Sequence, residues 1–285
     1  MTNPFQYVFG PVESWRLGRS LGIDPLSSKH KICNMDCIYC QLGRTLELSH
    51  ERKIYVTTDD VIAEINRIPL HFVDHITFVG RGEPTLAKNL GEMIRAVKAV
   101  RHEKVAVLTN SSLMYLNEVR DDLMAADFVV AKLDAGNQKL FEAVDQGQQL
   151  ALDEIIQGIR DFRLSFKGKL ALQIMLVDQN IKNIHQIAEI ARHIGANEIQ
   201  LDTPLRPSAV QPLERQRIQW AKKYFEDMPV KTVFDAPLKA FTPIDERATM
   251  KRHGNYHKPC NVEGPHTGHP QSFEIGPFYL KTQFV

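Results

Sequence analysis

Three cysteines lie within eight residues of one another, at Cys33, Cys37 and Cys40. Iron–sulfur clusters are bound by cysteine thiolates, usually four of them. The C-x3-C-x2-C spacing suits a tight loop whose thiolates reach three corners of a cubane 4Fe–4S cluster, and the fourth cysteine, Cys260, comes only 220 residues after Cys40. Such a local trio leaves one iron open to a ligand that is not protein, and an open iron can take part in chemistry.

Two other interpretations of the cysteine trio are weaker. Structural zinc is almost always closed by four ligands, typically as two separated pairs, so a zinc ion here needs a histidine from elsewhere. Three unrelated buried cysteines are the second alternative. The close spacing favours the iron–sulfur cluster over both.

Polar residues follow five segments whose apolar composition predicts buried strands. Glycines allow the backbone to approach a ligand closely, and Glu83 offers a carboxylate to an ammonium group. A turn followed by a helix cap also explains Gly80-Arg-Gly-Glu-Pro-Thr85. Five polar strand ends in succession nevertheless favour a ligand-lined cavity, since parallel α/β folds carry their chemistry on the loops after the strands. These residues are Gly80 to Thr85, Thr109 to Ser112, Lys132 and Asp134, Gln173 and Met175, and Asp202.

The segments that must position these groups alternate between strand and helix patterns. Taking residues 20–24 as the first strand, the chain contains six β/α units before about residue 230, and the cysteine loop directly follows the first strand. Alternation of this kind predicts βαβ units and a parallel sheet, either a partial barrel or an open doubly wound sheet. The predicted strands are 75–79, 105–108, 128–131, 170–176 and 198–201, and the predicted helices are 61–68, 90–97, 116–126, 150–166, 184–194 and 214–228.

Residues 235–285 differ from the rest of the chain. They hold six of the 15 prolines and four of the 11 histidines, without a clear helical stripe. We therefore expect a core of residues 1–234 and a loop-rich C-terminal extension, of which residues 254–277 cover the open end of the barrel. An auxiliary metal is a second interpretation of this extension, because it groups the metal-ligand residue types His253, His257, Cys260, His266 and His269.

Composition and charge exclude several classes of protein. The chain has 285 residues, 43% of them hydrophobic and 24% charged, which are globular values. It shows neither an apolar run long enough to span a membrane nor a secretory leader. Thiolate ligands need a reducing compartment, so we expect a cytoplasmic protein. The formal net charge of +1 gives no overall electrostatic attraction to nucleic acid.

The cysteine trio, with Tyr39 before its last cysteine, and Gly80-Arg-Gly-Glu-Pro84 after the second strand resemble the radical S-adenosylmethionine superfamily. The resemblance implies a six-unit partial (β/α)6 TIM-type barrel and a 4Fe–4S cluster on Cys33, Cys37 and Cys40. S-adenosylmethionine then binds the open iron and is cleaved to a 5′-deoxyadenosyl radical, using an electron from a donor such as flavodoxin or ferredoxin. The implied cofactor-binding residues are Tyr39, Gly80, Gly82, Glu83, Pro84, Asn110 and Asp134.

Three further segments resemble the wyosine-synthase-like branch of that superfamily, whose best-known member modifies a guanine of tRNA with pyruvate. They are residues 10–24, 132–135 and 203–207. One difference stands out, because no cysteine precedes Cys33 to hold the second cluster of that member. Lys132 could form a Schiff base, but an ion pair with Asp134 is the favoured interpretation.

Three functional classes follow. The first is a radical enzyme that modifies tRNA or another RNA, which the resemblance favours. The second is a radical enzyme that acts on a small molecule or peptide, or activates a glycyl-radical partner, which the near-neutral charge favours. The third is a non-catalytic iron–sulfur or zinc protein.

Overall fold

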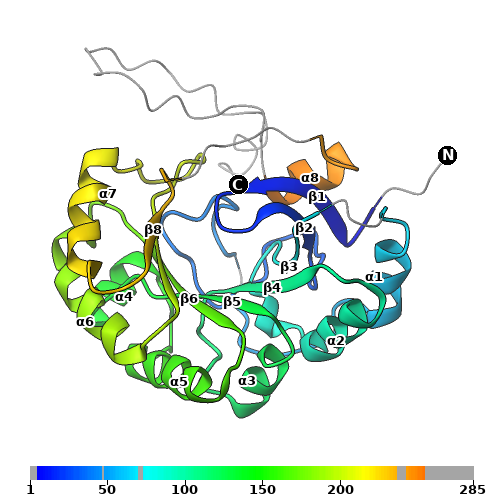
Figure 1. Ribbon diagram of the computed structural model, residues 1–285, viewed down its shortest axis with the longest axis horizontal. Coiled ribbons are helices and arrows are strands. Elements are labelled where there is room, and N and C mark those ends of the chain that lie inside the picture. The colour runs from blue at the N-terminus through cyan, green and yellow to red at the C-terminus, as the bar shows by residue number, and fades with distance from the viewer. Residues whose placement is uncertain (1–4, 47, 70–72, 236–241, 254–285) are drawn as a thin grey trace, which may run out of the picture.

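A single eight-stranded sheet, curled into an open barrel, organises the computed structural model, which describes residues 5–46, 48–69, 73–235 and 242–253 (Figure 1). The strands lie in the sheet in the same order as in the chain. They are β1 (Val8–Ser14), β2 (Gly18–Ile23), β3 (His75–Phe78), β4 (Lys104–Thr109), β5 (Phe128–Lys132), β6 (Lys169–Met175), β7 (Glu198–Asp202) and β8 (Val230–Thr232).

Strand β1 pairs with β2 in an antiparallel hairpin, and each strand from β2 to β7 pairs in parallel with the next. This pairing confirms the predicted partial α/β barrel. Figure 1 shows helices along the outer, convex side of the sheet. The helices are α1 (Thr58–Ile65), α2 (Leu90–Val100), α3 (Asn117–Leu123), α4 (Gln138–Val144), α5 (Leu152–Ser165), α6 (Ile184–Ile194), α7 (Arg215–Lys222) and α8 (Glu246–His253), with short 3-10 turns η1 (Pro84–Leu86), η2 (Ile181–Asn183) and η3 (Lys223–Phe225).

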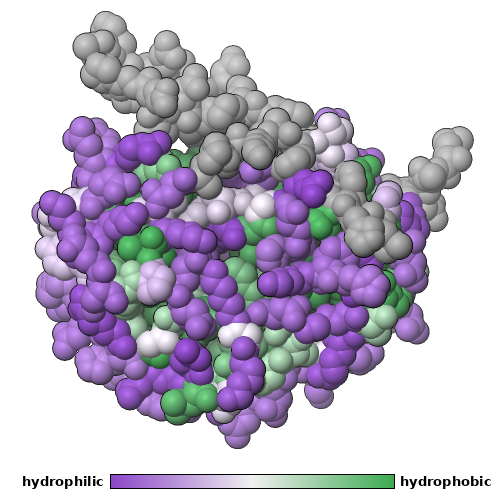
Figure 2. Space-filling view, in the orientation of Figure 1, coloured by the Kyte–Doolittle hydropathy of each residue, from purple (hydrophilic) through white to green (hydrophobic). Residues whose placement is uncertain are grey.

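The outer helices bury one apolar face against the sheet. In α6, for example, the buried positions recur at helical spacing, and the helix ends at Gly195 with a φ of 68°. On the face of the molecule seen in Figure 2, the coloured surface is largely hydrophilic with scattered hydrophobic areas. The buried side chains of α6 are Ile184, Ile187, Ala188, Ala191 and Ile194.

The main apolar core lies between the sheet and the outer helices, and a smaller apolar cluster fills the inside of the barrel toward the start of the strands. Leu17, in the turn between β1 and β2, packs there with Phe128 at the first position of β5. The remaining members are Ala106, Val130 and Ala171, with Leu108 against them. Because this end of the interior is filled, the carboxyl ends of the strands are left to form a site.

Four elements differ from the sequence predictions. Strand β1 was not predicted because Gly10 and Pro11 interrupt its alternation of apolar and polar residues. Strand β8 was not predicted because it has only three residues. Helix α4 has seven residues and only two buried side chains, which is too little for a periodic signal.

Helix α8 (Glu246–His253) lies in the segment predicted to be loop-rich, where the sequence indicated no helix. The helix is attached through side chains that have no apolar periodicity. Arg252 Nε donates to Asp24 Oδ2 at 2.8 Å with both side chains buried, and the Gly10 N–H donates to Thr249 Oγ1 at 2.9 Å.

Several expectations for the C-terminal extension lie outside the described residues. These are the cover that residues 254–277 were expected to form over the open end of the barrel, and the auxiliary metal on His257, Cys260, His266 and His269, together with the His253 side chain. The division into 1–234 and 235–285 stays a prediction. Among the helices that the structure describes, none combines the length and apolar character needed to cross a membrane.

Candidate functional site

The cysteine loop, residues 32–45, follows β2 at the carboxyl end of the parallel strands. All three cysteines are free thiols; Cys33 is buried and Cys37 and Cys40 are partly exposed. The loop is tightly turned, because the Cys40 N–H donates to the Cys37 carbonyl and the Gly43 N–H to the Cys40 carbonyl, both at 3.0 Å. The predicted tight loop is therefore present.

The Gly80–Pro84 segment after β3 holds the start of this loop. The Ile32 N–H donates to the Arg81 carbonyl and the Glu83 N–H donates to the Ile32 carbonyl, both at 3.0 Å. A β-carbon at Gly82 would lie 1.6 Å from the Ile32 carbonyl oxygen, so only glycine permits this approach. At Gly80 a β-carbon would meet Asp24 at 2.3 Å. In this structure both glycines make room for protein neighbours.

Glu83 is buried, and its carboxylate already accepts four hydrogen bonds. Oε1 accepts from the Thr85 N–H at 3.0 Å, the Thr85 hydroxyl at 2.7 Å and the Thr109 hydroxyl at 2.6 Å. Oε2 accepts from the Asn110 N–H at 2.6 Å. Glu83 thus caps η1, which begins at Pro84, as the alternative interpretation expected. Burial raises the pKa of Glu83 and these donors oppose the rise. Within the described part of the chain a single hydrogen bond reaches Oε2, so this oxygen can accept another donor.

Asn110 lies beside the cysteine loop. Its side-chain amide donates to Cys33 Sγ at 3.5 Å and to Asn34 Oδ1 at 2.8 Å. Its own Oδ1 accepts from the Ser112 hydroxyl at 2.6 Å, and that hydroxyl accepts from the Asn34 amide at 2.6 Å. The three polar side chains form a closed ring that connects the end of β4 to the first cysteine.

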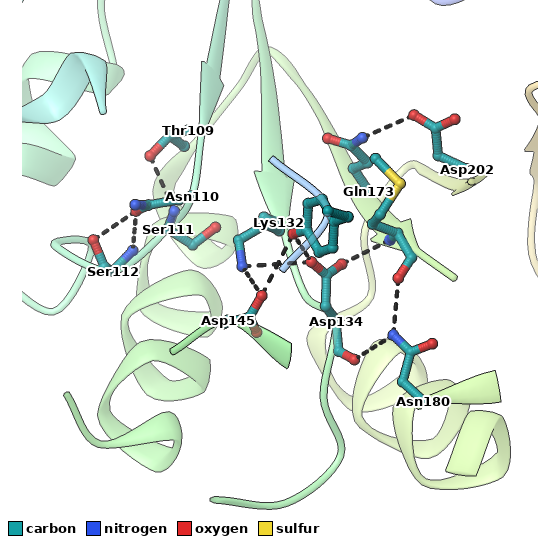
Figure 3. Close-up of polar contacts among 12 residues, drawn as sticks. Thr109, Asn110, Ser111, Ser112, Lys132, Asp134, Asp145, Gln173, Asn180 and Asp202 are labelled. Carbon is teal, nitrogen blue, oxygen red and sulfur yellow. Dashed lines mark hydrogen bonds and ion pairs between the residues drawn. The ribbon is translucent and has the colours of Figure 1, made fainter. Parts of the chain in front are cut away.

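Lys132 and the buried carboxylates Asp134 and Asp145 form a polar cluster on the other side of the loop (Figure 3), and the Tyr39 hydroxyl joins this cluster. The Tyr39 hydroxyl donates to Asp134 Oδ2 and lies 3.4 Å from Asp145 Oδ1. Lys132 Nζ pairs with Asp145 and is 3.4 Å from Asp134 Oδ2, which confirms the expected ion pair. Asp145 follows α4, and the sequence analysis missed it because α4 gave no signal.

Burial controls the ionisation of this cluster. It raises the pKa of Asp134 to about 7, although the Lys132 ammonium opposes the rise. Burial lowers the pKa of Lys132, but Asp145 and Cys37 more than reverse this and hold it well above its usual value. Burial and the neighbouring Asp134 also raise the pKa of Tyr39 well above its usual value.

The thiols respond to the same environment. Burial raises the pKa of Cys37 strongly, with Lys132 opposing, and raises that of Cys33 to about 11, with Glu83 adding to the rise and Lys31 opposing it. A metal centre must therefore displace protons from these thiols. Lys31, whose ammonium donates to the Gly43 carbonyl at 3.0 Å, interacts electrostatically with all three cysteines.

The residues fit an iron–sulfur cluster better than a single metal ion. Among the described residues, no three His, Cys, Asp or Glu side chains are grouped so that they could hold one ion. A cubane cluster has its irons at separate corners, so its thiolates need not converge on one point. Two largely buried cations, Lys31 and Lys132, also lie near the trio, which suits an anionic cluster with thiolate ligands.

One further polar contact crosses the barrel interior. Arg16, from the β1–β2 turn, pairs with Asp202 at the end of β7, and Gln173 Nε2 donates to the same carboxylate at 3.0 Å. Trp15 lies under the Arg16 guanidinium at 4.2 Å. The sequence placed Asp202 at this end of the barrel but gave no indication that Arg16 reaches it.

A partial α/β barrel with three free cysteines on the loop after its first parallel strand is the arrangement of a metallocofactor enzyme. The sequence profile of the Radical SAM superfamily matches residues 28–191, more than half of the chain, so the chain belongs to the radical S-adenosylmethionine superfamily of enzymes. Membership implies S-adenosylmethionine and an iron–sulfur cluster as cofactors.

Three individual similarities complete the comparison. The chain is 39% identical over 220 residues to a UPF0026 protein of Synechocystis sp., covering 76% of this chain and 81% of that protein. It is 38% identical over 228 residues to a protein named GTPase Obg of Brachyspira hyodysenteriae, covering 77% of this chain but only 33% of that protein. A solved structure of TYW1 with a lysine–pyruvate adduct shares the fold, with a TM-score of 0.56 and 17% identity over 74% of each chain.

Proposed function

We propose that this protein is a radical S-adenosylmethionine enzyme in which Cys33, Cys37 and Cys40 hold a 4Fe–4S cluster, and that its substrate is tRNA or a related RNA. The observation that carries the proposal is the trio of free thiols, close to two largely buried lysines, at the carboxyl end of the barrel. When bound, the cluster and S-adenosylmethionine supply a 5′-deoxyadenosyl radical that abstracts a substrate hydrogen atom. Radical chemistry belongs to the cofactors, while the protein binds, orients and shields them.

The residues around the loop have roles that follow from their contacts. Oε2 of Glu83, with capacity for another donor, is proposed to accept the ammonium group of S-adenosylmethionine. Asn110 and Asp134 lie on opposite sides of the loop and are proposed to border the nucleoside, with Tyr39 between Asp134 and the cysteines. The electron is proposed to come from a small donor such as flavodoxin or ferredoxin.

The support for an RNA substrate comes from similarity. Segments 10–24, 132–135 and 203–207 resemble the tRNA-modifying branch, and a TYW1 structure shares the fold. The lysine–pyruvate adduct named for that structure has no support at Lys132, because Asp145 and Asp134 pair with its ammonium and hold its pKa above the usual value, and a protonated amine is no nucleophile. We therefore propose RNA as the substrate without proposing pyruvate as the second one.

Anaerobic reconstitution tests the cofactor part of the proposal. The wild-type protein should take up about four irons with equivalent sulfide and release 5′-deoxyadenosine from S-adenosylmethionine when dithionite is added. A triple Cys33→Ala, Cys37→Ala, Cys40→Ala variant should do neither, while Cys260→Ala should do both. Normal iron uptake by the triple variant, or loss of the cluster in Cys260→Ala, would contradict the assignment.

The substrate is tested separately with bulk tRNA prepared from cells that lack this gene. We expect tRNA to bind with a salt-dependent affinity and to acquire a new modified nucleoside in step with 5′-deoxyadenosine release. If cofactor cleavage is normal but no nucleoside changes mass, the RNA proposal fails. A small molecule or peptide, which the near-neutral charge of the chain favours, then becomes the leading substrate class.

A further inference from the structure

We infer that Asp145 and Lys132 form a clamp that positions Cys37, and that the Lys132 ammonium makes the cluster bound at Cys37 easier to reduce. In this pair Asp145 is the positioning residue for the loop, and Lys132 supplies the charge. The inference rests on the proposed function, because it concerns the cluster that the function requires.

The backbone after α4 holds the loop on both sides of Cys37. The Asp36 N–H donates to the Asp145 carbonyl at 3.2 Å, and the Ile38 N–H donates to the Val144 carbonyl at 3.0 Å. The two donors immediately precede and follow Cys37. The end of one helix therefore fixes the backbone that presents this thiol.

The side chain of Asp145 connects the loop around Cys37 to the sheet of the barrel. Its carboxylate accepts from Lys132 Nζ and lies 3.4 Å from the hydroxyl of Tyr39, two residues beyond Cys37. Lys132 is the last residue of β5, whose backbone pairs with β4 and β6, so its position is set by the sheet. Asp145 is itself buried, with 1% of its surface exposed, and its N–H donates to the Phe141 carbonyl at 2.8 Å. The clamp thus runs from the sheet through one carboxylate to the loop.

The charges of Lys132 and Asp145 lie close enough to Cys37 to affect the reduction of a cluster bound there. Lys132 is largely buried and its ammonium is held by Asp145, whose backbone carbonyl accepts from the N–H of the residue next to Cys37, so the positive charge lies close to this thiol. Reduction adds one negative charge to the cluster, and in a poorly solvated interior a nearby charge changes that equilibrium strongly. The ammonium of Lys132 therefore favours the reduced cluster, and the carboxylates of Asp145 and Asp134 oppose it.

A purely structural role of the Lys132–Asp145 ion pair would lead to different results from an electrostatic role. If the pair only supports the fold, removing either partner should lower iron uptake and leave the potential of the remaining clusters unchanged. If the charges act on the cluster, removing the cation and removing the anion should shift the potential in opposite directions. The sign of the shift separates the two interpretations.

The test measures the reduction potential of the reconstituted cluster in the full chain, for Lys132→Met, Asp145→Asn and the double variant. The protein is titrated with dithionite, and each cluster takes up one electron. At a fixed ambient potential, Lys132→Met should lower the ratio of reduced to oxidised cluster about tenfold, which is about 59 mV for a one-electron couple. Asp145→Asn should raise that ratio, and the double variant, which restores charge balance, should return toward wild type. Lys132→Arg keeps the charge and should change little.

A matched control removes a different buried carboxylate of the same barrel. Glu198 accepts from Lys169 at 2.9 Å and Gln200 at 2.8 Å, and Glu198→Gln should leave the potential unchanged. Shifts of the same sign in Lys132→Met and Asp145→Asn, or wild-type potentials in both with normal iron content, would overturn the electrostatic part.

The positioning part is tested without the cluster by hydrogen exchange in the apo-protein. Asp145→Asn should speed exchange of the Asp36 and Ile38 amides about tenfold, and Glu198→Gln should not. Unchanged protection at both amides would overturn the clamp. If the wild-type protein takes up no cluster, the proposed function fails, and this exchange measurement still decides whether Asp145 holds the loop.

Discussion

Replacing Gly82 by alanine tests whether the Gly80–Pro84 segment serves first to attach the cysteine loop. The added β-carbon would lie 1.6 Å from the Ile32 carbonyl oxygen, about half of an ordinary van der Waals separation. The obstacle is backbone and cannot be relieved by rotating a side chain. The loop must therefore move away from β3, and the Ile32–Arg81 and Glu83–Ile32 hydrogen bonds break.

The cost can be worked out from those contacts. Two backbone hydrogen bonds contribute about 1 kcal/mol each, and leaving buried partners unpaired adds on the order of 1–3 kcal/mol. We expect Gly82→Ala to lose about 3 kcal/mol of the free energy of unfolding, or about 6 °C in melting temperature for a chain of this size. Because the displaced segment at Ile32 leads directly into Cys33, iron uptake should fall as well.

Gly195→Ala is the matched control. Gly195 has a φ of 68°, yet an added β-carbon would meet nothing within 4 Å. Its cost is the left-handed backbone strain alone, about 1–2 kcal/mol, and its iron content should be normal. Denaturant unfolding of the apo-proteins and iron analysis after reconstitution provide both numbers.

One result would refute this reasoning. If Gly82→Ala is as stable as Gly195→Ala and takes up iron normally, but binds S-adenosylmethionine poorly, then the space at Gly82 belongs to the cofactor. The attachment of the loop would then have to depend on other contacts.

Three further predictions concern buried polar groups. Arg252→Met should cost about 3–5 kcal/mol in denaturant unfolding, because Asp24 is left buried without its cation; a cost below 1 kcal/mol would show that α8 contributes little. Asp134, whose pKa is raised from 3.8 to about 7, stabilises the fold below about pH 4 and loses this contribution as pH rises through 7. The free energies of unfolding of wild type and Asp134→Asn should therefore be compared across this pH range. Their difference should change by roughly 4 kcal/mol, at about 1.4 kcal/mol per pKa unit. A difference that stays constant with pH would contradict the prediction. Glu83→Ala should weaken binding of S-adenosylmethionine by equilibrium dialysis while iron content stays normal, and unchanged affinity would refute the placement of the ammonium group.

Sequence reasoning succeeded where the signal was local. The spacing of Cys33, Cys37 and Cys40 is contained in one loop, and the apolar strands from β3 to β7 each carry their own pattern. The ion pair of Lys132 with Asp134 was also predictable, because the two residues are near neighbours at the end of one strand.

The parts that sequence could not predict depend on contacts between distant segments. Asp145 follows a seven-residue helix with little apolar periodicity, and its contacts with the cysteine loop exist only once the barrel has formed. Arg16 reaches Asp202 across the barrel interior for the same reason. Glu83 illustrates a second reason why sequence was insufficient. Its carboxylate caps η1 and can still accept another donor. A sequence motif cannot show which of these two roles is the more important, because one side chain can have both.

The two outer strands of the open sheet have a consequence for how the protein behaves at high concentration. A sheet that does not close on itself exposes backbone donors and acceptors along its edges, where a strand of another molecule can add and start aggregation. Here β1 includes Pro11, which has no N–H, and Gly10 is already bridged to Asp245 beside α8. At the other edge, β8 spans only Val230–Thr232, too short to template a long pairing. The barrel can therefore stay open between β1 and β8 without offering long strand edges for intermolecular β-pairing.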